Sequence, residues 1–388
     1  MLSDINVALG VTGSIAAVKT VELAHELRRR GASVRGVTTE GATGIVHPWA
    51  IEFATENDVV TEITGAVEHV ELCGDDGWAD VLLIAPATAN TVGKVAAAID
   101  DTPVTTCATT ALGAGVPVVI APAMHEPMYD HPGVLEAIER VESWGVPFVD
   151  PRIEEGKAKI ASVDTIALET ARAAGASPLA GTQVVVTAGA TAEPIDPVRV
   201  LTNRASGKTG RAVARACRAR GADVTLVHGR GDFDGAVPWA DLRRVETGAE
   251  MREAVDAVAG NADALVSAAA IGDYSVDAAG EKLRSGREDL TLSLHPTPKL
   301  IDGVRERHPD LPIVGFKAET SGDDEEMITR SRQIMERAGL SFVVANDASV
   351  MGENETRAVF VHGDKTGVFE GTKAGLGARV AEELADTV

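Results

Sequence analysis

The chain has 388 residues, of which 45% are hydrophobic and only 3% aromatic, and its formal net charge is −22. The length is enough for two domains with full hydrophobic cores, and the composition is that of a globular protein. Because an acidic surface repels nucleic acid, the charge excludes a nucleic-acid partner and favours a small nucleotide escorted by a metal ion. The acidic excess is typical either of a solvated surface or of adaptation to a salt-rich cytoplasm.

The sequence offers no membrane or export segment. No apolar run approaches the roughly 20 residues of a membrane-spanning helix, and no basic segment precedes the first apolar strand. We therefore expect no membrane partner and no signal peptide. Cys73, Cys107 and Cys217 are scattered and odd in number, which favours reduced thiols in the cytoplasm over a disulfide framework or a zinc site.

The first half alternates apolar strands with amphipathic helices. A strand at Asn6–Gly10, a Gly-Ser turn, a helix at Ile15–Arg30 and a strand at Ser33–Thr38 make a βαβ unit. Further strands are expected at Val81–Ala85, Val116–Ala121 and Pro147–Val149. This alternation predicts a doubly wound parallel sheet over residues 1–175.

Polar residues follow these strands, at the edge where open α/β sheets bind ligands. The turn from Gly10 to Ser14 lacks the G-x-G-x-x-G pattern of dinucleotide sites. It suits a single terminal phosphate or, equally, a simple N-cap at Ser14. The second strand ends in Thr38-Thr39, and Ala85–Asn90, Asp100–Cys107 and Ala121–Tyr129 carry the later polar groups.

A second α/β pattern follows a small, Gly- and Pro-bearing segment, 173–181, which we interpret as a linker. A strand at 184–187 leads through a polar loop into a helix over 205–220, and another helix is expected at 249–258. The remaining strands are expected at Asp223–Val227, Ala264–Ser267, Ile313–Gly315, Phe342–Ala345, Ala358–His362 and Gly367–Glu370. The predicted fold class is therefore α/β, with two successive doubly wound (Rossmann-like or flavodoxin-like) parallel-sheet domains, the second over 182–388.

The loops of the second half hold motifs that packing does not explain. Residues 196–210 read D-P-V-R-V-L-T-N-R-A-S-G-K-T-G, but they lack the spacing of a P-loop. The segment A-A-A-I-G-D-Y (268–274) follows a buried strand and carries an acidic residue, Asp273, near its end. E-K-L-R (281–284), T-P-K (297–299) and F-K-A-E (316–319) follow.

In the first half, G-V-T-G-S-I-A-A-x-K, E-H-V-E-L, A-P-A-T-A-N and A-P-A-M resemble the flavin-containing cysteine decarboxylases. In particular they resemble the phosphopantothenoylcysteine decarboxylase half of the bifunctional coenzyme A biosynthesis proteins, and the second half is similar to their phosphopantothenate–cysteine ligase half. The resemblance implies a cytoplasmic enzyme that converts 4′-phosphopantothenate, cysteine and CTP to 4′-phosphopantetheine. It also implies FMN in the first domain, Mg2+ with CTP in the second, and a homo-oligomer based on trimers.

The same resemblance assigns cofactor and nucleotide sites. It implies FMN binding by Gly13, Ser14, Ile15, Thr39, Thr88, Asn90 and Thr106. It implies CTP binding by Ser267, Ala268, Ala269, Asp273, Lys282, Pro298, Lys299, Leu300, Ile301 and Phe316, with Asp273 also holding the metal. Spacing alone favours Asp273 as the cap of a strand end, and the joint occurrence of the motifs reverses that preference.

Catalytic roles are implied in both halves. His69 matches a histidine that does acid/base work near the flavin, although it also fits a surface residue at the start of a helix. Asn203 matches an asparagine that stabilises the acyl-cytidylate, and Arg199 lies in the same loop. Lys282 matches a lysine that steadies the negative charge when the amine attacks, and its alternative is a solvated lysine.

Three departures from the family pattern follow. His125 stands where bacterial members have an asparagine that grips the substrate carboxylate. The substrate flap lacks the family's proton-donating cysteine, and Lys157 or Lys159 either replaces it, binds the substrate phosphate or belongs to a solvated loop. Over the triphosphate, arginines replace the expected lysines at Arg330, Arg332 and Arg337, and arginine binds phosphate as well.

Two other classes of protein compete with this interpretation. A nicotinamide-dependent oxidoreductase would share the doubly wound fold, but G-x-G-x-x-G is missing from both halves. A non-catalytic flavoprotein that only binds partners would not need the A-A-A-I-G-D-Y and E-K-L-R segments.

Overall fold

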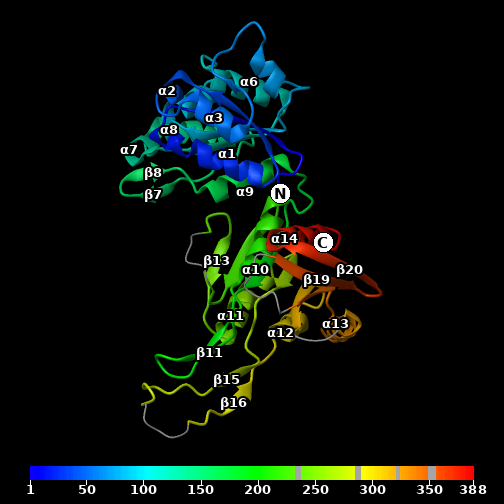
Figure 1. The fold of residues 1–388 in the computed structure, drawn as a ribbon. Coiled ribbons are helices and arrows are strands. Elements are labelled where there is room, and N and C mark those ends of the chain that lie inside the picture. Colours follow the sequence, from blue (N-terminus) through cyan, green and yellow to red (C-terminus); the bar gives the residue numbers. More distant parts are fainter. Residues whose placement is uncertain (232–236, 285–289, 320–323, 348–354) are drawn as a thin grey trace. The chain divides into compact units, whose positions relative to one another are not determined.

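The computed structural model describes residues 1–388 apart from 232–236, 285–289, 320–323 and 348–354. It divides into two compact units, unit 1 at Met1–Ala176 and unit 2 at Ser177–Val388 (Figure 1). The last helix of unit 1 ends at Ala174, so the first two residues of the expected linker are helical. Within the described residues, no helix combines the length and the apolar composition that crossing a membrane requires.

Unit 1 is built on a parallel sheet with the strand order β3-β2-β1-β4-β5. Its strands are β1 (Asn6–Val11), β2 (Ser33–Thr38), β3 (Val59–Val60), β4 (Val81–Ala87) and β5 (Val118–Pro122). The strand order reverses between β1 and β4, so the carboxyl ends of these two strands form the switch point of a doubly wound sheet. Every residue of β4 is buried, as expected of a strand covered on both faces.

Helices cover both faces of this sheet. The helices of unit 1 are η1 (Ile15–Lys19), α1 (Thr20–Arg29), α2 (Glu40–Thr43), α3 (Pro48–Thr55), α4 (Glu68–Cys73), α5 (Ala89–Ala96), α6 (Pro103–Ala114), α7 (Glu126–Tyr129), α8 (Pro132–Glu142) and α9 (Val163–Ala174). Helix α1 packs against α3 and α9, whereas α6 packs against α4 and α5, and α5 against α8. The expected helix at Ile15–Arg30 thus begins as the 3-10 turn η1 and continues as α1. Strand β5 begins at Val118, two residues late, because Gly115 (φ 74°) ends α6 and Val116 still donates to Ala111.

A small antiparallel sheet completes unit 1. It has the order β6-β8-β7, formed by β6 (Met124–His125), β8 (Lys157–Lys159) and β7 (Arg152–Glu154). Its register places His125 opposite Lys157. The expected strand at Pro147–Val149 is reduced to one parallel bridge between Phe148 and Ile120.

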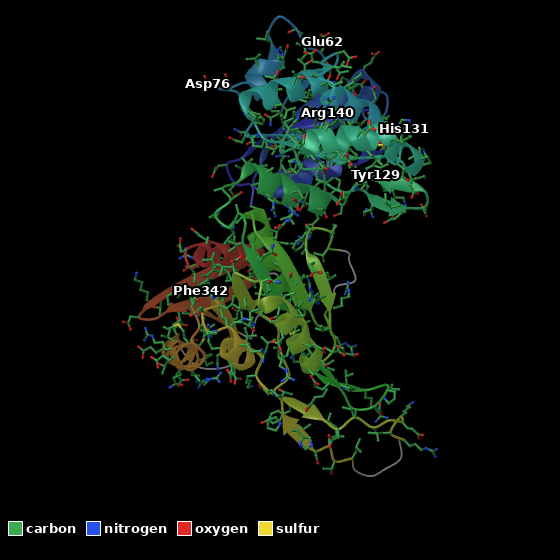
Figure 2. All side chains as sticks on the ribbon, turned by 180° about the vertical axis from the view of Figure 1, so that it is seen from behind. Glu62, Asp76, Tyr129, His131, Arg140 and Phe342 are labelled. Carbon is green, nitrogen blue, oxygen red and sulfur yellow. The ribbon has the colours of Figure 1, made fainter. Side chains whose placement is uncertain are left out.

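Unit 2 is built on a larger sheet with the order β13-β12-β9-β14-β17-β18-β19-β20. The strands are β9 (Gln183–Ala188), β12 (Asp223–His228), β13 (Asp241–Arg244), β14 (Ala264–Ser267), β17 (Ile313–Glu319), β18 (Phe342–Asp347), β19 (Glu355–His362) and β20 (Lys365–Thr372). They are parallel up to β18, and β19 and β20 add antiparallel at the edge. Phe342 of β18, labelled in Figure 2, is fully buried and stacks on Phe360 of β19 with 6.3 Å between ring centroids.

The described helices of unit 2 are α10 (Lys208–Ala219), α11 (Gly248–Ala259), α12 (Leu300–Arg307), α13 (Asp324–Ala338) and α14 (Lys373–Ala385). Helices α10 and α14 pack together, whereas α11, α12 and α13 pack in sequence against one another. Helix α10 begins three residues later than expected, because Gly207 takes the left-handed conformation (φ 75°). Two short hairpins extend from the unit, one of β10 (Ala192–Pro194) with β11 (Val200–Thr202) and one of β15 (Tyr274–Val276) with β16 (Leu294–Pro296) (Figure 1). The doubly wound α/β class predicted for both halves is confirmed.

The contact between α10 and α14 depends on a glycine. A Cβ atom added to Gly377 would lie 2.5 Å from the carbonyl oxygen of Ala212, which is backbone and cannot move aside. We expect Gly377→Ala to lower the free energy of unfolding of unit 2 by about 1–3 kcal/mol. Gly367→Ala, where a Cβ meets nothing within 4 Å, should be neutral or slightly stabilising. Differential scanning calorimetry would decide, and equal transitions for the two variants would contradict the packing argument.

Candidate active sites

Three motif loops of unit 1 meet at its switch point. The hydroxyl of Thr12, just after β1, donates to the carbonyl of Pro86 (2.8 Å) and accepts the N–H of Thr88 (3.1 Å). The hydroxyl of Ser14 donates to the carbonyl of Ala123 (3.0 Å). The G-V-T-G-S, A-P-A-T-A-N and A-P-A-M motifs therefore lie side by side, although more than 70 residues separate the first from the others.

The turn at Gly13 is held closely against the start of α2. A Cβ on Gly13 would lie 3.0 Å from the backbone of Gly41, so any side chain there would crowd the start of α2. Thr39 caps α2 by accepting the N–H of Ala42. The Thr38 hydroxyl is buried and has no hydrogen-bond partner among the described residues. An orphaned buried hydroxyl beside a glycine turn is what a site for a polar ligand leaves behind when its ligand is absent.

The other residues expected to bind flavin differ in the hydrogen bonds that their side chains make within the protein. The Ser14 hydroxyl accepts the N–H of Ala16 as the N-cap of η1 and donates to the carbonyl of Ala123, so it both caps this helix and connects the first loop to the A-P-A-M loop. The Thr106 hydroxyl bonds the carbonyls of Asp100 (2.9 Å) and Thr102 (2.8 Å). Ile15 is 78% exposed and Asn90 is exposed, and both stand at this same edge of the sheet.

His69 is the member of E-H-V-E-L whose side chain the fold leaves uncommitted. Glu68 bonds Thr64, whose hydroxyl lowers the pKa of that carboxyl, and Glu71 pairs with Arg35 (2.7 Å). Leu72 is fully buried in the core. The Nδ1 atom of His69 is also buried, yet none of the described residues supplies it with a hydrogen-bond partner. The geometry thus favours a ligand-facing His69 over a surface residue at a helix start.

The substrate flap (residues 153–160) contains strand β8, which pairs with β6 and so places a lysine opposite a histidine. His125 lies opposite Lys157 in the β6–β8 pairing, which sequence spacing alone does not reveal. Lys159 is paired with Glu154 (3.1 Å) and Glu155 (2.9 Å), and these hydrogen bonds raise its pKa. Of the two flap lysines, Lys157 is thus the one placed next to His125.

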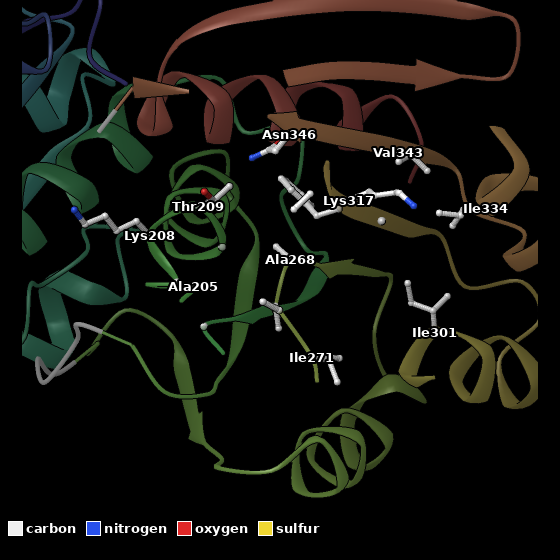
Figure 3. A pocket seen from close by; sticks show the side chains of 18 of the residues that line it. Ala205, Lys208, Thr209, Ala268, Ile271, Ile301, Lys317, Ile334, Val343 and Asn346 are labelled. Atoms are coloured by element: carbon white, nitrogen blue, oxygen red, sulfur yellow. The ribbon is translucent and has the colours of Figure 1, made fainter. Parts of the chain in front are cut away.

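Unit 2 contains a cleft of about 500 Å³ at the carboxyl ends of its central strands. Of the expected nucleotide residues, the cleft is lined by Ala268, Ala269, Asp273, Lys299, Ile301 and Phe316. Ser267 and Leu300 are buried, and together with Pro298 they stand outside the lining. Figure 3 shows Lys208 and Lys317 on opposite sides of the cleft, with Ile271 and Ile301 along another side.

Threonine hydroxyls hold the loop that carries Asp273. Thr187 of β9 accepts the N–H of Ala269 (3.1 Å), and Thr191 accepts the N–H of Gly272 (2.8 Å). Both hydroxyls are buried, so these bonds are shielded from water. The strand order of unit 2 reverses between β9 and β14, which makes the carboxyl ends of these two strands its switch point. The two threonine bonds fix the A-A-A-I-G-D segment on β9 across this switch point.

The cleft is cationic on an acidic protein. Lys208, Lys317, Arg337 and Lys373 line it, and Lys299 forms an ion pair with Asp273. Asp273 is exposed and stands apart from other ligands, because no group of three His, Cys, Asp or Glu able to hold a metal occurs in the described part of the chain. A single carboxylate supplies at most a small part of the oxygen ligands that a magnesium ion requires.

Asp196 ties the other catalytic candidates together. Its buried carboxylate accepts the N–H groups of Val198, Arg199 (2.8 Å each) and Leu283 (3.1 Å). Burial alone would raise the pKa of Asp196, but these donors and the Arg199 charge hold it below the usual value. The backbone of the E-K-L-R segment is thus fixed beside the loop of Arg199, and it brings Lys282 with it.

The three catalytic candidates of unit 2, Arg199, Asn203 and Lys282, lie outside the lining of the cleft. Arg199 donates to the carbonyl of Leu283 (2.5 Å), and the exposed Lys282 stands on the same extension. Asn203 reaches closest, because its amide nitrogen donates to the carbonyl of Ala270 (2.7 Å), a residue that does line the cleft.

Only one of the three expected arginines faces the cleft. Arg330 lies near Glu326, and Arg332 donates to the carbonyls of Gly363 (3.0 Å) and Asp364 (3.2 Å). Arg337 lines the cleft and pairs with Asp302 (2.8 Å). Sequence reasoning did not single out Lys317, Asn346 or Lys373 as ligand residues. The F-K-A-E segment at the end of β17 and the A-N-D run of residues 345–347 at the end of β18 are usable signals for the first two, whereas nothing in the sequence marks Lys373.

Fold and sites together define the class: a two-domain α/β protein with a separate ligand-binding edge in each domain. The family model described as Flavoprotein matches residues 1–174, and the model described as DNA/pantothenate metabolism flavoprotein C-terminal domain matches residues 179–388. The coenzyme A biosynthesis bifunctional protein CoaBC of Thermococcus kodakarensis is 50% identical over 362 residues, which are 92% of this chain and 89% of that protein. The CoaBC protein of Methanocaldococcus jannaschii is 33% identical over 390 residues, 99% of this chain and 94% of that protein.

Among solved structures, the FMN-dependent cysteine decarboxylase SpaF is 31% identical, with a TM-score of 0.40, and the match covers 45% of this chain and 100% of that one. The chain belongs to the family of bifunctional CoaBC proteins of coenzyme A biosynthesis. The resemblance inferred from the motifs is confirmed, and the oxidoreductase and binding-module interpretations are set aside.

The position of Arg337 in the cleft lining predicts that this arginine contributes to the binding of an anion. Arg337→Gln should weaken the binding of magnesium tripolyphosphate by about tenfold, since a charged donor is worth roughly 1.5 kcal/mol or more. Arg332→Gln is the matched control on the same helix, because its guanidinium bonds carbonyls outside the cleft. Isothermal titration calorimetry would measure both affinities, and an equal loss in the two variants would argue against the cleft as the triphosphate site.

Proposed function

We propose that unit 2 joins cysteine to 4′-phosphopantothenate at the expense of CTP, and that unit 1 decarboxylates the product to 4′-phosphopantetheine with FMN. The observation that carries the proposal is that each unit gathers its motif loops at its own switch point. Unit 1 offers imidazoles and hydroxyls, which suit proton transfer, and unit 2 offers a cationic cleft, which suits phosphates.

In unit 1 the residues fit a flavin mononucleotide. The tight turn at Gly13 and the backbone N–H groups of Gly13 and Ile15 would hold its phosphate, whereas the Ser14 N–H already donates to the carbonyl of Thr12 (2.8 Å). Around the same edge lie Thr38, Thr39, Thr88, Asn90 and Thr106. The chemistry that bound FMN supplies is a reversible electron sink for the thiol, which makes loss of the carboxylate possible. The chain's own side chains then hold the substrate and move protons.

His69 is proposed as the acid/base residue, because its buried Nδ1 has no hydrogen-bond partner among the described residues and an imidazole ring can both accept and donate a proton. His125 would hold the substrate carboxylate in place of the bacterial asparagine, since an imidazole N–H donates to a carboxylate. Lys157, opposite His125, would donate the proton in the reductive half of the reaction. Lys159 is held by two glutamates and serves to order the flap.

In unit 2 the cleft would hold CTP. Ala268 and Ala269 let the nucleotide approach the backbone, Ile301 and Phe316 give apolar contact, and Lys299 lies beside Asp273. Asp273 would hold Mg2+ together with phosphate oxygens and water. The cations around the cleft offset the charge of the triphosphate, a substrate phosphate and a carboxylate on this acidic chain.

The carboxylate of 4′-phosphopantothenate attacks the α-phosphorus of CTP, which releases pyrophosphate and forms an acyl-cytidylate. Asn203 would steady this acyl group from its place beside Ala270. When the cysteine amine attacks, CMP leaves, and Lys282 with Arg199 would stabilise the developing negative charge. Both stand on the extension organised by Asp196, so we infer that this extension approaches the cleft during the second step.

We further propose that the protein works in the cytoplasm as a homo-oligomer based on trimers. Its three cysteines are free and buried, as suits a reducing compartment. In unit 1, Ile15, Trp49 and Phe53 leave large apolar side chains exposed at 74–78%, which suits a surface that a second copy covers.

One pair of variants tests both halves at once. With 4′-phosphopantothenate, cysteine and CTP supplied, Asn203→Asp and His69→Asn should each reduce CO2 release by about 100-fold or more. Added phosphopantothenoylcysteine should restore CO2 release to Asn203→Asp but not to His69→Asn. If it restored both or neither, the division of labour would be wrong.

A second pair tests the proton donor. Lys157→Met should preserve first-turnover CO2 release but lower the formation of 4′-phosphopantetheine by about 100-fold, because it removes a general acid. Lys159→Met, on the same strand, should keep both within a few-fold. Quenched-flow measurement of CO2 and product would separate the steps, and normal product formation by Lys157→Met would exclude Lys157 as the donor.

A further inference from the structure

A buried histidine lies behind the cleft of unit 2. His228 is the last residue of β12 and is only 1% exposed. Its Nε2 atom lies 2.9 Å from Nη1 of Arg211 on α10, and its Nδ1 lies 2.6 Å from the carbonyl oxygen of Gly229. None of the motifs that led to the proposed function contains His228.

The partners fix the tautomer of this imidazole. A guanidinium group only donates hydrogen bonds, so Nε2 must accept from Arg211. The single ring proton is then on Nδ1, from which it is donated to Gly229. Burial lowers the pKa of His228, the Gly229 carbonyl opposes this in part, and the charges of Arg211 and Arg244 lower it further. A neutral histidine therefore serves as the acceptor that orients Arg211.

Arg211 in turn holds the entry to α10. The same Nη1 donates to the carbonyl of Ser206 (3.0 Å). The next residue, Gly207, has φ 75°, and a Cβ there would lie 2.8 Å from Nε2 of His228 and 2.9 Å from Nη1 of Arg211. The turn is thus packed directly on the His228–Arg211 pair.

This turn is part of the cleft wall. Ser206, Gly207 and Lys208 all line the cleft, and α10 begins there without a side-chain cap. The first N–H groups of an uncapped helix lack intrahelical partners and favour an anion. The direction in which these N–H groups point depends on the backbone conformation of the Ser206–Gly207 turn.

We propose that His228 is a positioning residue of the ligase site: as a neutral acceptor it fixes Arg211, and through Arg211 the Ser206–Lys208 turn that meets a phosphate group. The inference rests on the proposed function for the identity of that phosphate, which belongs either to CTP or to 4′-phosphopantothenate. It does not require His228 to touch a substrate.

The decisive measurement is the affinity for magnesium tripolyphosphate and for inorganic phosphate, by calorimetry on the full chain. His228→Leu removes the acceptor and should weaken at least one of the two by about tenfold, the loss of a charge-assisted hydrogen bond. His228→Gln, whose amide oxygen can accept from Arg211, should recover most of the affinity. His308→Leu, a partly buried histidine of the same unit outside the cleft lining, should change neither.

Steady-state kinetics with the same variants separate the two sources of phosphate. A rise in KM for CTP alone assigns the turn to the nucleotide, and a rise for 4′-phosphopantothenate alone assigns it to the substrate. In both cases kcat should stay within a few-fold. Arg211→Met should reproduce the effect, and the double variant should lose no more than either single one. Fully additive losses, or unchanged affinities in His228→Leu, would overturn the proposal.

A measurement on the unmodified protein covers the case in which His228→Leu does not fold. Nitrogen NMR of histidine-labelled protein, with His228→Gln to assign the signal, should find the Nδ1–H tautomer. An Nε2–H tautomer or a charged ring at neutral pH would overturn the proposal. Absence of CTP turnover by wild-type protein would instead count against the proposed function, while the affinities and the tautomer still decide the role of His228.

Discussion

Both sites depend on threonine hydroxyls that join the two strands on either side of a switch point. In unit 1, Thr12 after β1 bonds the carbonyl and N–H groups of the loop after β4. In unit 2, Thr187 on β9 and Thr191 just beyond it accept N–H groups of the loop after β14. Where parallel strands diverge, the sheet ladder no longer satisfies backbone groups, and buried polar groups must find other partners. The hydroxyls meet this need and fix the loops that carry the ligand groups.

The overall charge and the local charge of this chain have opposite signs. With 58 acidic and 36 basic residues, the surface as a whole does not attract an anionic nucleotide. Within unit 2, however, lysines from α10, β17 and α14 line one cleft. For the proposed nucleotide, short-range contact with these groups would therefore have to supply the binding energy. Because such contacts act within a few ångströms, salt screens them less than long-range attraction.

Much of the fold could be predicted because its signals are local. Apolar runs marked β1, β4, β9 and β14, and motif loops marked both switch points. Boundaries failed where one residue's backbone decided them: Gly207 delays α10, and Gly115 with Val116 delays β5. Tertiary packing places His125 opposite Lys157 and gives Arg332 and Arg337 different surroundings. Spacing along the chain carries no information about either arrangement. Lys373 has no motif and reaches the cleft only because α14 packs on α10.

The placement of the three cysteines has a chemical consequence. Cys73, Cys107 and Cys217 are all fully buried, and burial raises the pKa of Cys217 to about 12. The hydrogen bond with Cys73, together with burial, raises the pKa of Cys107 as well. A thiolate is the species that exchanges with disulfides, so neither Cys107 nor Cys217 attacks at neutral pH, and the Cys73 sulfur is shielded by its burial. An enzyme that handles free cysteine and thiol-bearing products is thereby protected from mixed disulfides with its own reactants.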